Sequence, residues 1–373
     1  MKNTKKILFG MLAASALFLF SACDENNVKP GDDYGILPSN FKVDVPASLT
    51  TNTTMKSAQG DTLSGNDIYG HLANFIAIGE GSAEIVEAII FHIRLYNIES
   101  VIDLTYTSDE DFRVKHLAVE ADAEFDGRTW EYQLTITDVL SEGNADGGKG
   151  MQVFWNNNPI EGISIIKPYN LNRTENENAA DAIFRIDYSE VEMGGYESHM
   201  IVSIVDLPVT GENADPFSVN NLKMFVGKKG DIVDVYGNSN HPNAQFFTDN
   251  TGFNWAFVAS GSESANIGVA EVGLPASTLD SDDRSVLLEE YSILNVLTAE
   301  INQWFLDEIG IRPSEEDLAN YLQNAEAPGY FNKDGFVQAG NAPAEGYDAL
   351  ESSILELAPF NPKYVSELAV SFK

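Results

Sequence analysis

The strongest constraint on the fold is an alternation of apolar and polar residues that begins at Val101 and continues, with turns, to Gly273. In residues 117–125, apolar side chains recur at every second position. The Asp126-Gly127 pair that follows suits the positive φ angles of a tight hairpin turn, and residues 130–137 return with the same period. This period is typical of β-strands with one buried face, so the stretch predicts a series of strands joined by hairpins.

Further strands are expected at residues 151–155, 162–167, 182–188, 198–206, 222–226, 232–236, 253–260 and 267–273. No helical pattern falls between them, which excludes parallel βαβ pairing and predicts an antiparallel meander. A large antiparallel sheet rarely stays flat, so we expect it to curl into a barrel or a half-barrel. The expected class is α+β, with N-terminal and C-terminal helices packed on the sheet.

Helical periods flank this region. After a short strand at 41–45, we expect one helix that Ser64 or Asn66 caps and that ends at Gly79-Glu80-Gly81, and a second that Ser82 caps. Beyond the sheet, the sequence predicts a helix at 283–309, a shorter one capped by Ser314, a loop at 328–346, a helix at 347–357 and a final strand at 364–372.

The N-terminus has the build of a secretory signal. Three lysines precede an apolar segment too short to span a bilayer, and Phe20-Ser21-Ala22 leads directly to Cys23, the single cysteine of the chain. This ending resembles the lipobox of bacterial lipoproteins, in which cleavage leaves a diacylated and then N-acylated cysteine as the first residue. The resemblance implies that Cys23 is the lipidation site and that the protein is attached to a membrane through its N-terminal lipid.

Residues Asp24 and Glu25 resemble the acidic export tag of surface lipoproteins in the Bacteroidota. This resemblance implies an outer-membrane protein at the cell surface, with the periplasmic face as the alternative. Asp61-Thr62-Leu63 resembles the O-glycosylation pattern of the same phylum.

The expected organisation has four parts. Residues 1–22 are a signal peptide, and 23–39 are the lipidated cysteine with a flexible tether. Residues 40–275 form a β-rich domain with two N-terminal helices. Residues 276–373 are mainly helical, and either form a second domain after Ala276 or pack on the same sheet.

Charge excludes one class of partner. The chain carries 22 basic and 57 acidic residues, and removal of the leader takes three lysines and no acid, which changes the net charge from −35 to −38. Such a surface repels polyanions, so nucleic acid is not an expected partner.

No catalytic or metal-binding signature stands out, and no cofactor is expected. The five histidines are scattered without metal-ligand spacing. Glu142, Asn144 and Asp146 offer oxygens for a cation, but a hairpin loop explains them equally well. Residues 332–336 resemble part of a calcium loop without its two anchoring acids, and Gly237-Asn238-Ser239-Asn240-His241 lacks the second glycine of a nucleophile elbow. Both are therefore expected to be turns, in which His241 does not reach Ser239.

Aromatic and asparagine side chains are the remaining candidates for ligand contacts. They line an apolar pocket if the sheet encloses one, or stack on sugar rings if they face outward near the asparagine-rich turns. The candidate residues are Trp130, Tyr132, Trp155, Tyr236, Asn238, Asn240 and Trp255.

Three functions remain open for a lipid-anchored protein of the cell envelope. The first is non-enzymatic binding of a hydrophobic small molecule or of a partner. The second is a surface glycan-binding module or glycoside-active enzyme, and the third is a structural or assembly subunit of an envelope complex.

Overall fold

The computed structural model describes residues 36–51, 64–94, 101–209, 217–244 and 252–373. Cys23, Asp24, Glu25 and Asp61-Thr62-Leu63 lie outside the described residues, so the predictions for them stay predictions.

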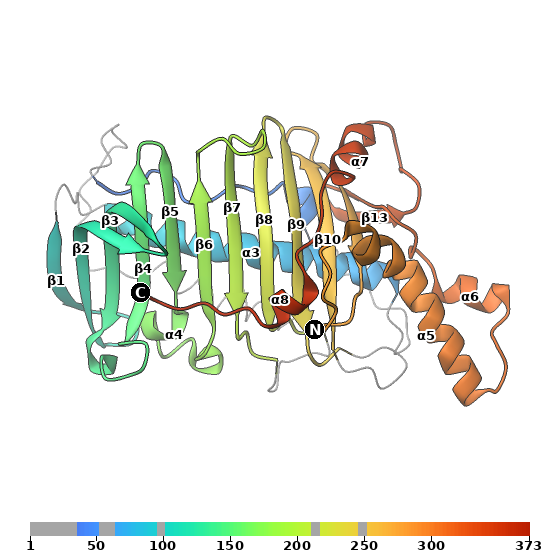
Figure 1. Ribbon diagram of the computed structural model, residues 1–373, viewed down its shortest axis with the longest axis horizontal. Helices are drawn as coiled ribbons and strands as arrows, with labels where there is room; N and C mark the ends of the chain where they lie inside the picture. The colour runs from blue at the N-terminus through green and yellow to red at the C-terminus, as the bar shows by residue number, and fades with distance from the viewer. Residues whose placement is uncertain (1–35, 52–63, 95–100, 210–216, 245–251) are drawn as a thin grey trace. The chain divides into compact units, whose positions relative to one another are not determined.

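Thirteen strands form one antiparallel sheet in which every strand follows its sequence neighbour, and the sheet is not closed (Figure 1). The structure confirms the predicted antiparallel meander with helices. Because the sheet is open, the complete barrel, one of the two expected forms, is not present. The strands are β1 (Ile102–Thr107), β2 (Val114–Phe125), β3 (Arg128–Asp138), β4 (Lys149–Asn157), β5 (Ile160–Ile166), β6 (Ile183–Ser189), β7 (Ser198–Val205), β8 (Asn221–Lys229), β9 (Ile232–His241), β10 (Phe253–Ser262), β11 (Ile267–Gly273), β12 (Gly329–Asn332) and β13 (Gly335–Ala339).

The predicted hairpin between β2 and β3 is present. Asp126 and Gly127 both have positive φ, 54° and 72°, and Phe125 pairs with Arg128. The register then follows the alternation, because Leu117 lies opposite Ile136 and Val119 opposite Leu134, and all four side chains are buried on one face.

The chain divides into two compact units. Of the described residues, unit 1 comprises 36–43, 79–94, 101–208 and 369–373, and unit 2 comprises 44–51, 64–78, 209, 217–244 and 252–368. The expected boundary after Ala276 is not tested by this division and stays a prediction.

In unit 1, strands β1 to β7 carry the core. Residues 79–94 of helix α3 (Gly65–Arg94) contribute Val86, Ile89 and Ile93, all of which are buried. The 3₁₀ turn η1 (Val139–Ser141) lies in the connection from β3 to β4, and the short helix α4 (Pro168–Leu171) and the 3₁₀ turn η2 (Glu177–Ala179) lie in the connection from β5 to β6.

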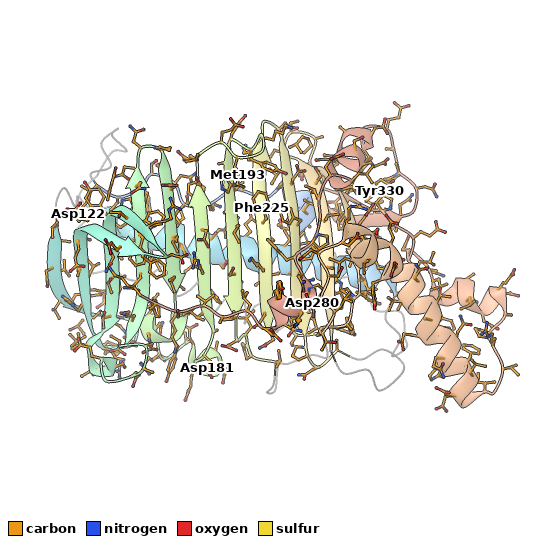
Figure 2. All side chains as sticks on the ribbon, in the orientation of Figure 1. Asp122, Asp181, Met193, Phe225, Asp280 and Tyr330 are labelled. Atoms are coloured by element: carbon orange, nitrogen blue, oxygen red, sulfur yellow. The ribbon has the colours of Figure 1, made fainter. Side chains whose placement is uncertain are left out.

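Unit 2 holds strands β8 to β13 and most of the helices. The π-helical turn η3 (Ser285–Glu290) and α7 (Asp348–Ile354) bury Leu287, Leu350 and Ile354 against β10 to β12, where Tyr330 joins the same core (Figure 2). The other helices are α2 (Ala47–Thr50), α5 (Ile293–Glu308), α6 (Glu315–Tyr321) and α8 (Pro362–Ser366). Ser314 caps α6 as predicted, in a reciprocal capping box with Asp317.

Two helices were expected before the sheet, but α3 is a single helix that runs through Gly79-Glu80-Gly81. Ser64 caps it as predicted, whereas Ser82 lies inside it and donates its hydroxyl to the Gly79 carbonyl. Each interior glycine costs about 1 kcal/mol relative to alanine. Buried apolar side chains on both sides of the glycines outweigh that cost.

The two predicted terminal strands are wrong. Phe41, Val43 and Val45 are buried, but the amides of Phe41 and Val43 bond to the side chains of Glu87 and Met200 instead of to a strand. The second expected strand, at 364–372, begins inside α8 and continues as irregular chain. Burial at every second residue also arises where an irregular segment lies on a sheet.

Two further expectations need correction. The expected helix at 283–309 is divided into η3 and α5, because Ser292 caps a new helix and accepts a hydrogen bond from the Asn295 amide. The expected loop at 328–346 contains β12 and β13, which are too short and too glycine-rich to produce a strand pattern.

Candidate functional site

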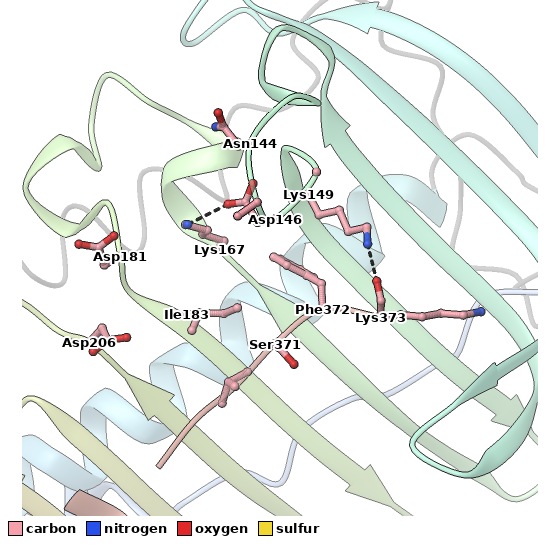
Figure 3. A pocket seen from close by; sticks show the side chains of 13 residues that line it. Asn144, Asp146, Lys149, Lys167, Asp181, Ile183, Asp206, Ser371, Phe372 and Lys373 are labelled. Carbon is pink, nitrogen blue, oxygen red and sulfur yellow. Dashed lines mark hydrogen bonds and ion pairs between the residues drawn. The ribbon is translucent and has the colours of Figure 1, made fainter. Parts of the chain in front are cut away.

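A polar cleft of about 680 Å³ lies in unit 1 (Figure 3). The loop between η1 and β4 forms one part of its wall, and the end of β5, the start of β6 and the end of β7 add further parts. The chain segment at residues 370–373 completes it. The lining residues are Asn144, Ala145, Asp146, Gly147, Lys149, Lys167, Asp181, Ile183, Asp206, Val370, Ser371, Phe372 and Lys373.

The cleft mixes charges of both signs with apolar surface. Lys167 forms an ion pair with Asp146 at 2.8 Å, and the Lys149 ammonium donates to the carbonyl oxygen of Lys373. In the view of Figure 3, Asp181 lies on the opposite side from Lys149, and Phe372 lies between them. A net charge of −35 makes this concentration of lysine unusual for the chain.

Asp146 is held as a carboxylate. Burial disfavours its charged form, but hydrogen bonds from Lys167, the Gly148 amide and Asn170 outweigh that effect and hold its pKa below the usual value. Asp146 thus serves as a fixed acceptor whose two oxygens bond within the chain.

A buried network supports this wall of the cleft. Oδ2 of Asp138, which is fully buried, accepts hydrogen bonds from Arg113 Nε at 2.8 Å, Arg173 Nε at 2.9 Å and the Ser141 hydroxyl at 2.8 Å. Arg173 also donates to Oδ1 of Asn170, whose amide donates to Asp146. Asp138 is therefore connected to the cleft through two intervening side chains.

Gly148 lies at the end of the loop between η1 and β4, where two backbone segments come close together. Its φ is +69°, and a Cβ atom there would lie 2.6 Å from the carbonyl oxygen of Asp138. The Gly148 carbonyl accepts a 2.8 Å hydrogen bond from the Asp138 amide. Only glycine combines this φ with such a close approach of the backbone.

The sequence-predicted residues of unit 1 lie in its core. Trp130 and Trp155 are buried, and their indole nitrogens donate to the carbonyls of Phe125 at 3.2 Å and Ile36 at 2.8 Å. Tyr132 is half-buried and stacks on Trp155 with ring centroids 5.5 Å apart. None of the three lines the polar cleft.

The sequence-predicted residues of unit 2 also have partners within the chain. The amides of Asn238 and Asn240 donate to the Phe360 carbonyl at 3.0 Å and to the Ser366 hydroxyl at 3.1 Å. Tyr236 stacks on Phe225 and also contacts the ring of Phe360. Trp255 is buried and contacts His241. The seven candidates are therefore divided between the two units.

The prediction of a turn at residues 237–241 is wrong. Ser239 and His241 do not sit in a solvated turn, because both lie in β9, where residues two apart share a face. The Ser239 hydroxyl is 2.8 Å from His241 Nε2, and His241 Nδ1 is 2.8 Å from the Phe217 carbonyl. That carbonyl can only accept, so Nδ1 carries the proton and Nε2 accepts from the serine. Both side chains are completely buried, so the pair is part of the core.

The described segments contain no group of three or more His, Cys, Asp or Glu side chains arranged to hold a metal ion. Among the helices in that part of the chain, none is long and apolar enough to cross a membrane.

Sequence reasoning missed most of the cleft. Asp146 was noticed only as a loop acid, and Lys149, Lys167, Asp181 and Phe372 carry no local motif. They come from separate segments, and only the strand register brings them together.

The chain was compared with known proteins in three ways. No family model, no curated protein and no solved structure matches it.

Asp138→Asn is expected to lower the free energy of unfolding by about 3 kcal/mol, because it removes the carboxylate that two arginines share in a buried position. Hydrogen bonds from Arg113, Ser141 and Arg173 overcome the cost of burial and lower the pKa of Asp138. Its stabilising effect is therefore complete above pH about 4 and is lost as the pH falls through the lowered value.

Chemical denaturation at neutral and acidic pH measures this effect. The matched control is Asp187→Asn, which removes a partly exposed pair with Arg185 and should cost less than about 1 kcal/mol. Equal losses in the two variants would contradict the special role of Asp138.

His241 should make stability depend on pH. Burial lowers its pKa to about 3, so below the unfolded-state value of 6.5 the unfolded chain takes up a proton that the folded chain does not. Stability should fall by about 2 kcal/mol between pH 7 and pH 5 for this group alone. In denaturation experiments at both pH values, His241→Gln should lose this difference, and Ser239→Ala, which keeps the imidazole, should retain it. A difference that is unchanged in His241→Gln would refute the assignment.

Proposed function

We propose that this chain is a lipid-anchored protein of the cell envelope that binds a polyhydroxylated ligand, such as a glycan, in the polar cleft of unit 1. The observation that carries this proposal is the combination of Asp146, Asp181, Lys149 and Lys167 around one cleft with the ring of Phe372.

The chemistry of the cleft favours a sugar over an apolar molecule. A hydroxyl group both donates and accepts, so it can donate to an aspartate while it accepts from a lysine. An aromatic ring offers an apolar surface to the C–H face of a sugar. Trp130, Trp155 and Trp255 are committed to the cores of their units, so the described residues support a hydrophobic-ligand pocket less well.

The state of Asp146 suits a role in binding better than a role as a catalytic acid. A glycosidase needs a carboxylic acid whose pKa is raised so that it can protonate the leaving group. The pKa of Asp146 is shifted in the opposite direction by its three donors. A fixed carboxylate of this kind orients a hydroxyl and gives up no proton.

The envelope location rests on the leader and Cys23. Acyl chains on Cys23 and the tether that follows would hold both units at a membrane surface. An outer-membrane position at the cell surface agrees with Asp24 and Glu25.

Intact-mass analysis of the protein from its native membrane should give a chain that begins at Cys23 and carries a diacylglyceryl group and an amide-linked acyl chain. The expected mass excess follows from the three acyl groups. A free thiol at Cys23, or a retained leader, would contradict the anchor while leaving the cleft untouched.

A glycan array, followed by titration of the best ligand, tests the cleft itself. Phe372→Ala and Asp181→Asn should each weaken binding by about tenfold, because they remove a stacking surface and a charged hydrogen-bond acceptor.

Matched controls come from the same unit. Phe112 is 80% exposed outside the cleft, so Phe112→Ala should bind as the unaltered chain does, and so should Asp122→Asn. Binding that is unaffected by the cleft variants, or no response across the array, would overturn the proposed ligand class.

A further inference from the structure

Helices α5 and α6 of unit 2 form a hairpin that is poorly buried. The buried residues of α5, Ile293, Leu297 and Ile301, all lie in its first part, and α6 has no buried residue. Figure 1 shows α6 beside α5, and their contact includes the rings of Phe305 and Tyr321, 6.3 Å apart. The second part of the hairpin thus has little support from the rest of its unit.

Large apolar side chains remain exposed where the two helices are joined. Leu306, Ile309 and Ile311 are 39%, 52% and 65% exposed. Isolated exposed apolar residues are common on protein surfaces, but a group on one hairpin is typical of an interaction surface.

A groove lies between the start of α5, helix α6, the segment after α6 and the end of β13, and Leu306, Ile309 and Ile311 do not line it. It has a volume of about 450 Å³, and Leu294, Leu318, Ala319 and Leu322 form its apolar part. Glu315 and Glu326, which are both exposed, also line it. The groove therefore combines apolar side chains with two carboxylates that solvent reaches.

The hairpin is strongly acidic. Residues 293–322 contain six acids, Glu300, Asp307, Glu308, Glu315, Glu316 and Asp317, and one base, Arg312, which gives a net charge of −5. A second copy of the chain and an anionic lipid surface are both negatively charged, so the hairpin repels them. A basic segment of another protein is attracted, so it is the favoured partner.

We infer that the α5–α6 groove is a docking site for a basic amphipathic helix of another protein. Apolar side chains from one face of that helix enter the groove between Leu294, Leu318 and Leu322. Its lysines or arginines pair with Glu315 and Glu326. This surface is separate from the ligand cleft of unit 1, so either proposal can fail without the other.

The inference is tested with the full mature chain and a labelled synthetic helical peptide that has leucine on one face and lysine on the other. Fluorescence anisotropy should detect saturable binding that weakens as salt is added. A scrambled peptide of the same composition, which cannot form an apolar face, should bind at least about tenfold more weakly.

Two substitutions, Leu318→Glu and Leu318→Gln, test whether the peptide binds in the groove. Because α6 has no buried residue, both variants should keep the fold, which circular dichroism verifies. Both should weaken peptide binding by about tenfold or more, although the glutamate adds attraction for a basic peptide. The matched control is Leu355→Glu at the end of α7, where Leu355 is 60% exposed, and its binding should not change.

Several results would overturn the inference. Equal binding of the scrambled peptide, or equal binding by the Leu318 variants, would reduce the effect to general attraction by an acidic protein. Self-association lost in Leu318→Glu would assign the groove to a second copy, and vesicle binding lost in that variant would assign it to lipid.

Discussion

The buried carboxylate of Asp138 is the interaction on which the cleft depends most. Its Oδ2 joins the start of β2 through Arg113, the turn η1 through Ser141, and the segment after α4 through Arg173. Asn170 links Arg173 to Asp146 in the cleft wall. A charge in this position is stable only while its donors stay in place, so the loops that carry them are fixed relative to one another. Removal of one donor would therefore disturb the polar cleft as well as the core.

Much of the sheet could be predicted from the sequence because the alternation of apolar residues constrains the register, and the short connections between strands set their antiparallel direction. The hairpin at Asp126-Gly127 is the clearest case, since turn chemistry and period agree there. The pattern reports burial and not hydrogen bonding, which is why residues 41–45 and 364–372 were taken for strands. The low helix propensity of Gly79 and Gly81 predicts a break between two helices. The structure has one continuous helix there, because tertiary packing overrides that propensity.

The site was less predictable for a related reason. Ser239 and His241 were placed in a turn because asparagines surround them, yet their i, i+2 spacing in β9 puts them on one face and in hydrogen-bond contact. Asn238 and Asn240 look like ligand contacts, but they donate to the chain's own segment at 360–366. The cleft residues are distant in sequence, and no local pattern links Asp146 with Phe372.

We propose that this protein binds its glycan in the polar cleft of unit 1. Hydrogen–deuterium exchange on the full mature chain, with and without the glycan it binds best, locates the segments that the ligand contacts. Exchange should slow at residues 144–149, 181–183 and 370–373, with little change in the α5–α6 hairpin. Slower exchange confined to other segments, at a glycan concentration that saturates binding, would refute the proposed site.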